Sequence, residues 1–183
     1  IKPFGECGTR FDWKINDVPY DHKYIFDDIG YNVKPLEFQA AMGLVQLERL
    51  EEFTQKRKIN FNRLNDAFKK YENSFILPKS EPLADPSWFA YPITIKNPKI
   101  ERHDLVRFFE ERKIQTRLLF SGNLTAHPAY NNGNVNYRLF NEPKNANKIL
   151  RDSFFLGVYP GITEEMMNYV TKTLDNFMSK VKD

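Results

Sequence analysis

The sequence of 183 residues contains a single cysteine, Cys7, and no apolar run long enough to cross a membrane. One cysteine excludes an internal disulfide. The net charge of +3 is small, and acidic residues alternate with basic ones along the chain, so nucleic acid is not indicated as a partner. Hydrophobic residues make up 41% and charged residues 28%, which is typical of a globular protein. We therefore expect a cytoplasmic protein that binds neither a membrane nor nucleic acid.

A chain of this length can form one domain, or a small domain together with a piece of another. Residues 1–30 are punctuated by proline and glycine and are predicted to be mostly loop. The opening residues, IKPFGECG, are typical of a loop within a protein. We expect the chain to be a piece of a longer one.

The segment 27–50, DDIGYNVKPLEFQAAMGLVQLERL, is the most informative part of the sequence. Gly30 and Asn32 favour a turn, and Pro35 suits the first turn of a helix. Apolar residues then recur every three or four positions and predict one long helix from Leu36 to about Tyr71. Ala40 and Gly43 keep one side of this helix thin, so that another backbone could approach it closely.

The remainder of the chain alternates between strand and helix patterns. Strands are predicted at 75–77, 88–96, 114–119 and 154–158, with Pro92 favouring an edge position or a bulge. Helices are predicted at 102–112, from Pro143 with Ile149 and Leu150 buried, and from a Thr163 cap to Val181. A long polar loop is expected over 121–139. This order predicts an α/β sandwich in which helices cover a short mixed sheet.

Several segments resemble the pyridoxal-phosphate-dependent sugar aminotransferase and dehydratase family, also called DegT/DnrJ/EryC1/StrS. The run GYNVKPLEFQAAMGLVQLERL resembles the family signature GYN-x-[RK]-x-x-x-x-QAA-x-G-x-x-QL-x-x-L. Further similarity lies in ECGTRF, DPSWFAYPIT and KIQTRLLFSGNLT. Within the family, the chain is most similar to the 3-dehydratases of CDP-4-dehydro-6-deoxyglucose.

The resemblance covers only the C-terminal part of such an enzyme. It implies that 1–53 form the tail of a large cofactor-binding domain and the start of a linking helix, and that 54–183 form the small α/β domain. The segment that anchors the cofactor, with a lysine in aminotransferases and a histidine in these dehydratases, is expected upstream. No catalytic residue is therefore assigned, and the fragment alone is expected to be inactive.

The resemblance also changes the interpretation of Cys7. By itself it is a spare cysteine, because an iron–sulfur cluster usually needs four thiolates. Iron–sulfur dehydratases of the family carry C-x-C-x7-C followed by G-[KT]-R-F, and the residues from Cys7 to Phe11 match the last element. The resemblance thus implies that Cys7 is the last ligand of a [2Fe-2S] cluster whose other ligands precede Ile1.

Four further residues are implicated, and three of them have a structural alternative. Asn32 fits a plain turn, but the family's matching asparagine reaches the cofactor phosphate of a neighbouring subunit, which implies a homodimer. Phe89 fits a core position, and Arg117 fits a cation at a strand end. In dehydratase relatives these positions lie by the sugar nucleotide, so Phe89 is expected beside the substrate, Arg117 near a phosphate and Asn123 near a hydroxyl.

The resemblance implies a dehydratase that uses pyridoxal or pyridoxamine phosphate, takes electrons from a flavin-containing reductase, and serves 3,6-dideoxyhexose and lipopolysaccharide biosynthesis. The alternatives are a nucleotide-sugar aminotransferase, a cluster-free 3-dehydratase, or a non-catalytic dimerisation domain. The motif ECGTRF argues against the first two alternatives.

Overall fold

The computed structural model describes residues 13–15, 18–20, 31, 35–131, 133 and 135–181. The chain divides into two compact units, Ile1–Val45 and Gln46–Asp183. The first unit contains an antiparallel hairpin of β1 (Trp13–Ile15) and β2 (Val18–Tyr20), in which Trp13 lies opposite Tyr20. The loop prediction for 1–30 missed this hairpin, because two strands of three residues are too short to show a periodic pattern.

The helical stretch predicted from Leu36 to Tyr71 is two helices, not one. α1 runs over Glu37–Glu48 and α2 over Leu50–Lys69, and Arg49 between them has φ −96° and ψ −2°. No residue of α1 is buried, and Phe38, Met42 and Leu47 are among its exposed apolar side chains. α2 buries one stripe, made by Asn60, Phe61, Leu64, Ala67 and Phe68.

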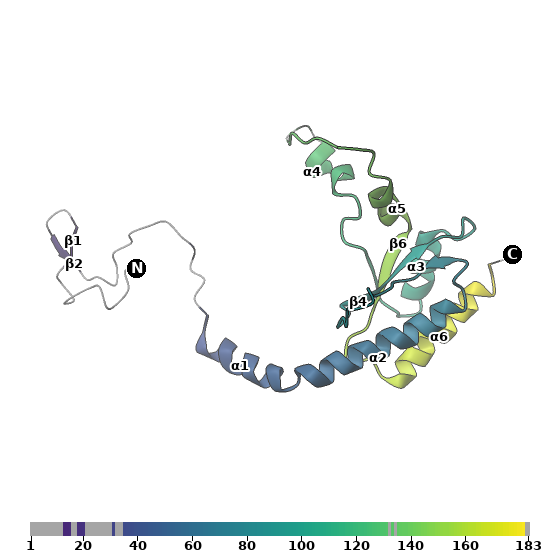
Figure 1. The fold of residues 1–183 in the computed structure, drawn as a ribbon, viewed down its shortest axis with the longest axis horizontal. Helices are drawn as coiled ribbons and strands as arrows, with labels where there is room; N and C mark the ends of the chain where they lie inside the picture. Colours follow the sequence, from purple (N-terminus) through teal and green to yellow (C-terminus); the bar gives the residue numbers. More distant parts are fainter. Residues whose placement is uncertain are drawn as a thin grey trace. The chain divides into compact units, whose positions relative to one another are not determined.

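The second unit is built around a four-stranded sheet of β3 (Phe75–Ile76), β4 (Ala90–Ile95), β5 (Thr116–Leu118) and β6 (Ser153–Gly157) (Figure 1). The strand order is β3-β4-β6-β5, and every neighbouring pair is antiparallel. The expected α/β class is confirmed. The sheet, predicted to be mixed, is antiparallel throughout the described strands.

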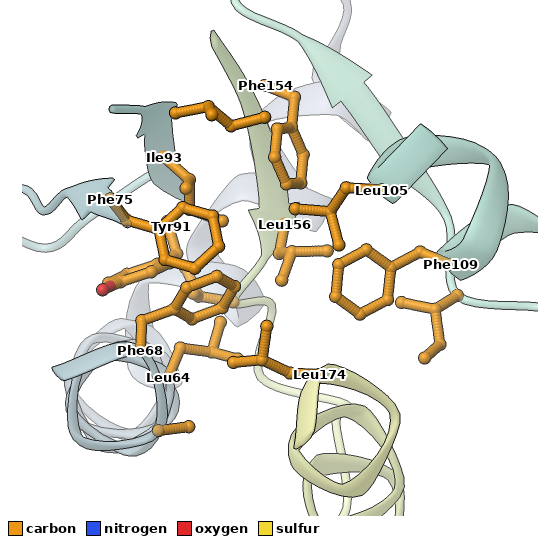
Figure 2. Packing of buried hydrophobic residues seen from close by; sticks show 14 of the residues in the cluster. Leu64, Phe68, Phe75, Tyr91, Ile93, Leu105, Phe109, Phe154, Leu156 and Leu174 are labelled. Carbon is orange, nitrogen blue, oxygen red and sulfur yellow. The ribbon is translucent and has the colours of Figure 1, made fainter. Parts of the chain in front are cut away.

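Helices α2, α3 (Arg102–Glu110) and α6 (Glu164–Met178) supply the apolar side chains that pack on one face of the sheet. α2 and α6 run side by side (Figure 1). Figure 2 shows Tyr91 and Leu156 of the sheet facing Phe68 of α2 and Leu174 of α6.

Burial raises the pKa of Tyr91 above its ordinary value of 10, with a contribution from the Asp66 charge. The predicted core face of the last helix is confirmed, and Thr163 caps it by accepting from the Met166 N–H at 3.2 Å.

Pro92 lies in a strand with neighbours on both sides, although a proline is expected at an edge. β3 pairs only with Ile95 and Thr94, so the Pro92 backbone has a partner strand on one side only, where it lies opposite Phe155. Since proline has no N–H to donate, it fits this locally open position. Pro92 therefore lies at a locally unpaired position, as predicted, although β4 as a whole is not an edge strand.

The connection between β5 and β6 holds η3 (Leu124–Ala126), α4 (Pro128–Asn131) and α5 (Lys144–Asp152). The sequence predicted a long loop over 121–139, and it did not predict the two short helices, η3 and α4, that lie within this segment. The burial of Ile149 and Leu150 was predicted wrongly, because no residue of α5 is buried. α5 does contact β4 and β6, and the main chain of Leu150 accepts a hydrogen bond from Arg102 at 2.9 Å.

Candidate functional site

Of the five residues singled out from the sequence, the structure describes three. Cys7 and Asn32 lie outside the described residues, so their assigned roles stay predictions. Phe89, Arg117 and Asn123 all belong to the second unit. The geometry around these three residues defines the candidate site.

Phe89 is not a core residue, because 69% of it is exposed. It directly precedes β4, and its position is fixed through its backbone. The Arg57 guanidinium on α2 donates to the Phe89 carbonyl at 3.3 Å, and the neighbouring Trp88 ring stacks on Phe61 with centroids 4.4 Å apart. The main chain is thus held while the Phe89 ring stays accessible.

Arg117 lies on β5 directly opposite Phe155 of β6. Side chains alternate between the faces of a strand, so these two share the face opposite the one that Leu156 and Phe154 present to the helices. Phe155 is nevertheless only 6% exposed, because the Phe89 ring covers it at a centroid distance of 5.8 Å and the Phe120 ring at 6.0 Å. We call Phe89, Phe120 and Phe155 the ring cluster.

Sequence reasoning missed Phe120 and Phe155 as members of this site. Phe155 reads as a strand residue in an apolar run, and only the pairing of β5 with β6 brings it opposite Arg117. Phe120 adopts φ +50°, a left-handed backbone conformation that non-glycine residues rarely take. The adjoining Ser121-Gly122-Asn123 marks a turn and was the one available signal for it.

Asn123 is 5% exposed, and its side chain organises the loop after β5. Its Oδ1 accepts from the Thr125 N–H at 3.1 Å and from the Thr125 hydroxyl at 2.7 Å, while its Nδ2 donates to Asn147 Oδ1 of α5 at 2.5 Å. The His127 ring adds a contact to the Ser121 carbonyl at 2.8 Å. The geometry assigns Asn123 a structural role in holding this loop, and its contact with a substrate hydroxyl stays a prediction.

An open groove of about 1350 Å³ lies beside β5. Its walls are β5 and the turn before it, the turn after β6, and the first half of α6, and both Arg117 and Phe155 line it. Lys113 and Lys172 add positive charge, and Glu164 and Glu165 add negative charge. The groove and the ring cluster thus meet at Arg117 and Phe155.

The described residues contain no group of three or more histidine, cysteine, aspartate or glutamate side chains placed to hold a metal ion. Nor does any helix in the described part combine the length and apolar character needed to cross a membrane. What the site presents is a cation, exposed aromatic rings and an open groove, which suit binding of an anionic, partly flat ligand.

Comparison with known proteins identifies the class. Residues 13–175 match the DegT/DnrJ/EryC1/StrS aminotransferase family, and the chain belongs to this family. The lipopolysaccharide biosynthesis protein RfbH of Salmonella typhimurium is 43% identical over 174 residues, which are 93% of this chain and 39% of RfbH. The dTDP-4-dehydro-2,6-dideoxy-D-glucose 3-dehydratase of Saccharopolyspora spinosa is 41% identical over 177 residues, 95% of this chain and 38% of that enzyme.

The fold agrees with this assignment. A solved GDP-4-keto-6-deoxymannose-3-dehydratase with a trapped PLP-glutamate geminal diamine superimposes with a TM-score of 0.72 at 25% identity. The match covers 83% of this chain and 39% of that structure. The chain therefore spans about two fifths of the length of the relatives that it matches.

Proposed function

We propose that this chain is the C-terminal part of a pyridoxamine-phosphate- and [2Fe-2S]-dependent 3-dehydratase of CDP-4-dehydro-6-deoxyglucose. Such an enzyme replaces the sugar C3 hydroxyl by hydrogen, which consumes a pair of electrons and releases water. The electrons are supplied by a flavin-containing reductase, and the product is a 3,6-dideoxyhexose for lipopolysaccharide. When bound, pyridoxamine phosphate supplies the electron sink and the cluster supplies a one-electron relay.

One observation carries the proposal at the level of the site. Phe89 and Arg117, which lie 28 positions apart in the sequence, meet around Phe155 on one face of the sheet, and both are exposed there. A guanidinium binds phosphate through paired N–H groups, and apolar rings beside it exclude water from the bound ligand. This arrangement supports the binding of a diphosphate-linked sugar.

The remaining roles are proposed from the resemblance. Asn32 donates to the cofactor phosphate across a homodimer interface, since a neutral amide can bind an anion without a counter-charge. Cys7 ligates the cluster together with cysteines upstream. Asn123 contributes an N–H to a sugar hydroxyl. The relatives named 3-dehydratase support the reaction class, whereas the CDP base and the cluster rest on ECGTRF and the similarity quoted for it.

The test uses the full-length protein reconstituted with iron, sulfide and pyridoxamine phosphate. We expect visible thiolate-to-iron charge-transfer bands, and we expect a Cys7→Ser variant to lose or shift them. With a flavin-containing reductase and NADH, the wild-type protein should convert CDP-4-dehydro-6-deoxyglucose to a 3-deoxy product that mass spectrometry detects as the loss of oxygen.

The two alternatives predict different results. A cluster-free 3-dehydratase would give identical spectra for wild type and Cys7→Ser and would deoxygenate the sugar without the reductase. An aminotransferase would transfer an amino group from glutamate to the C4 ketone and release no water from C3. Either result would overturn the proposed reductive dehydratase.

A further inference from the structure

The ring cluster presents more aromatic surface to solvent than the sheet needs for its own packing. Phe89 and Phe120 lie with their ring centroids 6.5 Å apart and their planes inclined by 27°, so they are close to parallel. Both cover Phe155, yet 75% of Phe120 and most of Phe89 stay exposed. Contiguous exposed apolar surface of this kind marks a binding site more often than a structural one.

Phe120 is held in place at a cost in backbone energy. Its φ of +50° is left-handed, which costs an L-residue about 1–2 kcal/mol relative to the right-handed region. The turn is fixed on both sides, since the Phe120 N–H donates to the Leu118 carbonyl at 2.7 Å and the Gly122 N–H to the Leu119 carbonyl at 3.1 Å. Because the ring is mostly exposed, burial offsets little of this strain. Strained residues of this kind concentrate at ligand sites.

A cation lies one strand away from the rings. Directly opposite residues of an antiparallel pair have their Cβ atoms about 5 Å apart, and Arg117 is directly opposite Phe155. The Arg117 side chain is exposed, and among the described residues it makes no salt bridge. A phosphate bound to Arg117 would thus hold an attached flat group beside Phe120 and Phe89.

We infer that the ring cluster is a stacking platform for the nucleobase of the substrate, and that it recognises the face of the base and not its edges. The inference rests on the proposed function for the presence of a nucleoside diphosphate, and it adds the part of the ligand that Phe120 contacts. Stacking on an aromatic ring tolerates different bases because every base has a π face. This site therefore discriminates weakly between cytosine, thymine and guanine.

The experiment measures equilibrium binding of CDP, dTDP, GDP and inorganic pyrophosphate to the full-length protein by titration calorimetry. We expect Phe120→Ala to weaken all three nucleoside diphosphates by a similar factor of about 5- to 150-fold, the range for loss of one base stack. Pyrophosphate binding should not change in this variant. Arg117→Gln should weaken pyrophosphate and the nucleoside diphosphates alike.

Three further variants make the result specific. Phe120→Tyr keeps a ring and should bind within about threefold of wild type, whereas Phe120→Leu keeps apolar bulk and should lose affinity as Ala does. Phe140→Ala is the matched control, because Phe140 is 90% exposed and lies in the segment before α5. This control should leave every affinity unchanged. Because the Phe120 ring is mostly exposed, its removal leaves no core cavity, and thermal unfolding checks that each variant is folded.

Unchanged nucleoside diphosphate affinity in Phe120→Ala would overturn the platform while leaving the dehydratase reaction intact. A loss for one base only would overturn recognition by the face of the base. Failure of the proposed function would show separately, as absent turnover of the 4-keto sugar in a wild-type protein that still binds nucleoside diphosphates.

Discussion

Asn123 donates from Nδ2 to Oδ1 of Asn147 at 2.5 Å, a contact between buried and half-buried amides 24 residues apart that ties the loop after β5 to α5. The same Asn123 side chain accepts twice from Thr125. Asn123 is therefore the donor and Asn147 the acceptor of one hydrogen bond, and substituting each by aspartate should have different effects on stability.

Asn123→Asp keeps the acceptor for Thr125 but cannot donate to Asn147, and its charge faces the Asn147 oxygen. We expect a loss of about 1–3 kcal/mol in the free energy of unfolding, the cost of a buried polar group without its partner. Asn147→Asp keeps the accepting oxygen and should cost less than about 1 kcal/mol. Denaturant unfolding at pH 7 measures both. Equal losses would show that the donor and acceptor are not arranged in this way.

Gly122 provides a second test of this loop. Its φ is +60°, and a Cβ on it would lie 2.6 Å from the Leu150 Cα. Gly122→Ala should therefore suffer both backbone strain of about 1–2 kcal/mol and overpacking of about 1–3 kcal/mol. Gly133 is the matched control, since it has φ +78° with no atom within 4 Å of such a Cβ, and Gly133→Ala should show the strain alone. A similar loss in both variants, measured by denaturant unfolding, would contradict the packing of Gly122 on Leu150.

The sequence predicted the elements of the second unit well where a periodic pattern met a strong end signal. Thr163 and the stripe through Met167 and Leu174 specified α6, and the short apolar run at 75–77, closed by Pro78, specified β3. The pattern failed at α5, where Ile149 and Leu150 repeat like core residues but are not buried. Periodicity shows that a helix has an apolar side, but it does not show whether other parts of the protein bury that side.

The candidate site was only partly predictable for a different reason. Phe89, Arg117 and Asn123 were identified from the resemblance of their motifs to the family, whereas their neighbours in space are revealed only by the pairing of strands in the folded sheet. Nothing local in the sequence places Phe155 opposite Arg117, because strand order and register are long-range properties. The left-handed backbone of Phe120 was signalled only by the turn residues that follow it, since phenylalanine itself gives no sign of that conformation.

Glu110 protects the open edge of the sheet at β5. Its Oε1 accepts from the Thr116 N–H at 2.6 Å and from the Thr116 hydroxyl at 2.8 Å. Glu110→Ala should free this amide, with faster hydrogen exchange at Thr116 and a loss of about 1 kcal/mol in the free energy of unfolding. Glu110→Gln keeps a neutral acceptor, so its exchange rate at Thr116 and its free energy of unfolding should lie between those of wild type and Glu110→Ala. Unchanged exchange at Thr116 in Glu110→Ala would mean that the carboxylate does not protect this strand edge.

Asp152, the last residue of α5, should make stability depend on pH on the acid side. Burial by itself would raise the pKa of its carboxyl, but hydrogen bonds from Arg151 and Lys148 and their charges outweigh this, so the pKa lies below the ordinary value of 3.8. Lys148 donates to Oδ2 at 2.9 Å and also to the Ile95 carbonyl at 3.0 Å, which ties α5 to β4. Breaking this pair should therefore loosen α5.

The sign of the effect follows from the depressed pKa. The unfolded chain takes up a proton near the ordinary value while the folded chain does not, so the contribution of Asp152 is full above pH 3.8 and is lost as pH falls through the folded pKa. Asp152→Asn should be less stable than wild type at pH 6, and the two free energies of unfolding should converge as pH falls below 3.8. Asp85→Asn removes the exposed pair with Lys58 and should lose at most about 0.5 kcal/mol at pH 6. A gap between Asp152→Asn and wild type that stays constant down to pH 2 would contradict the assigned charge pairing, because a purely steric defect does not titrate.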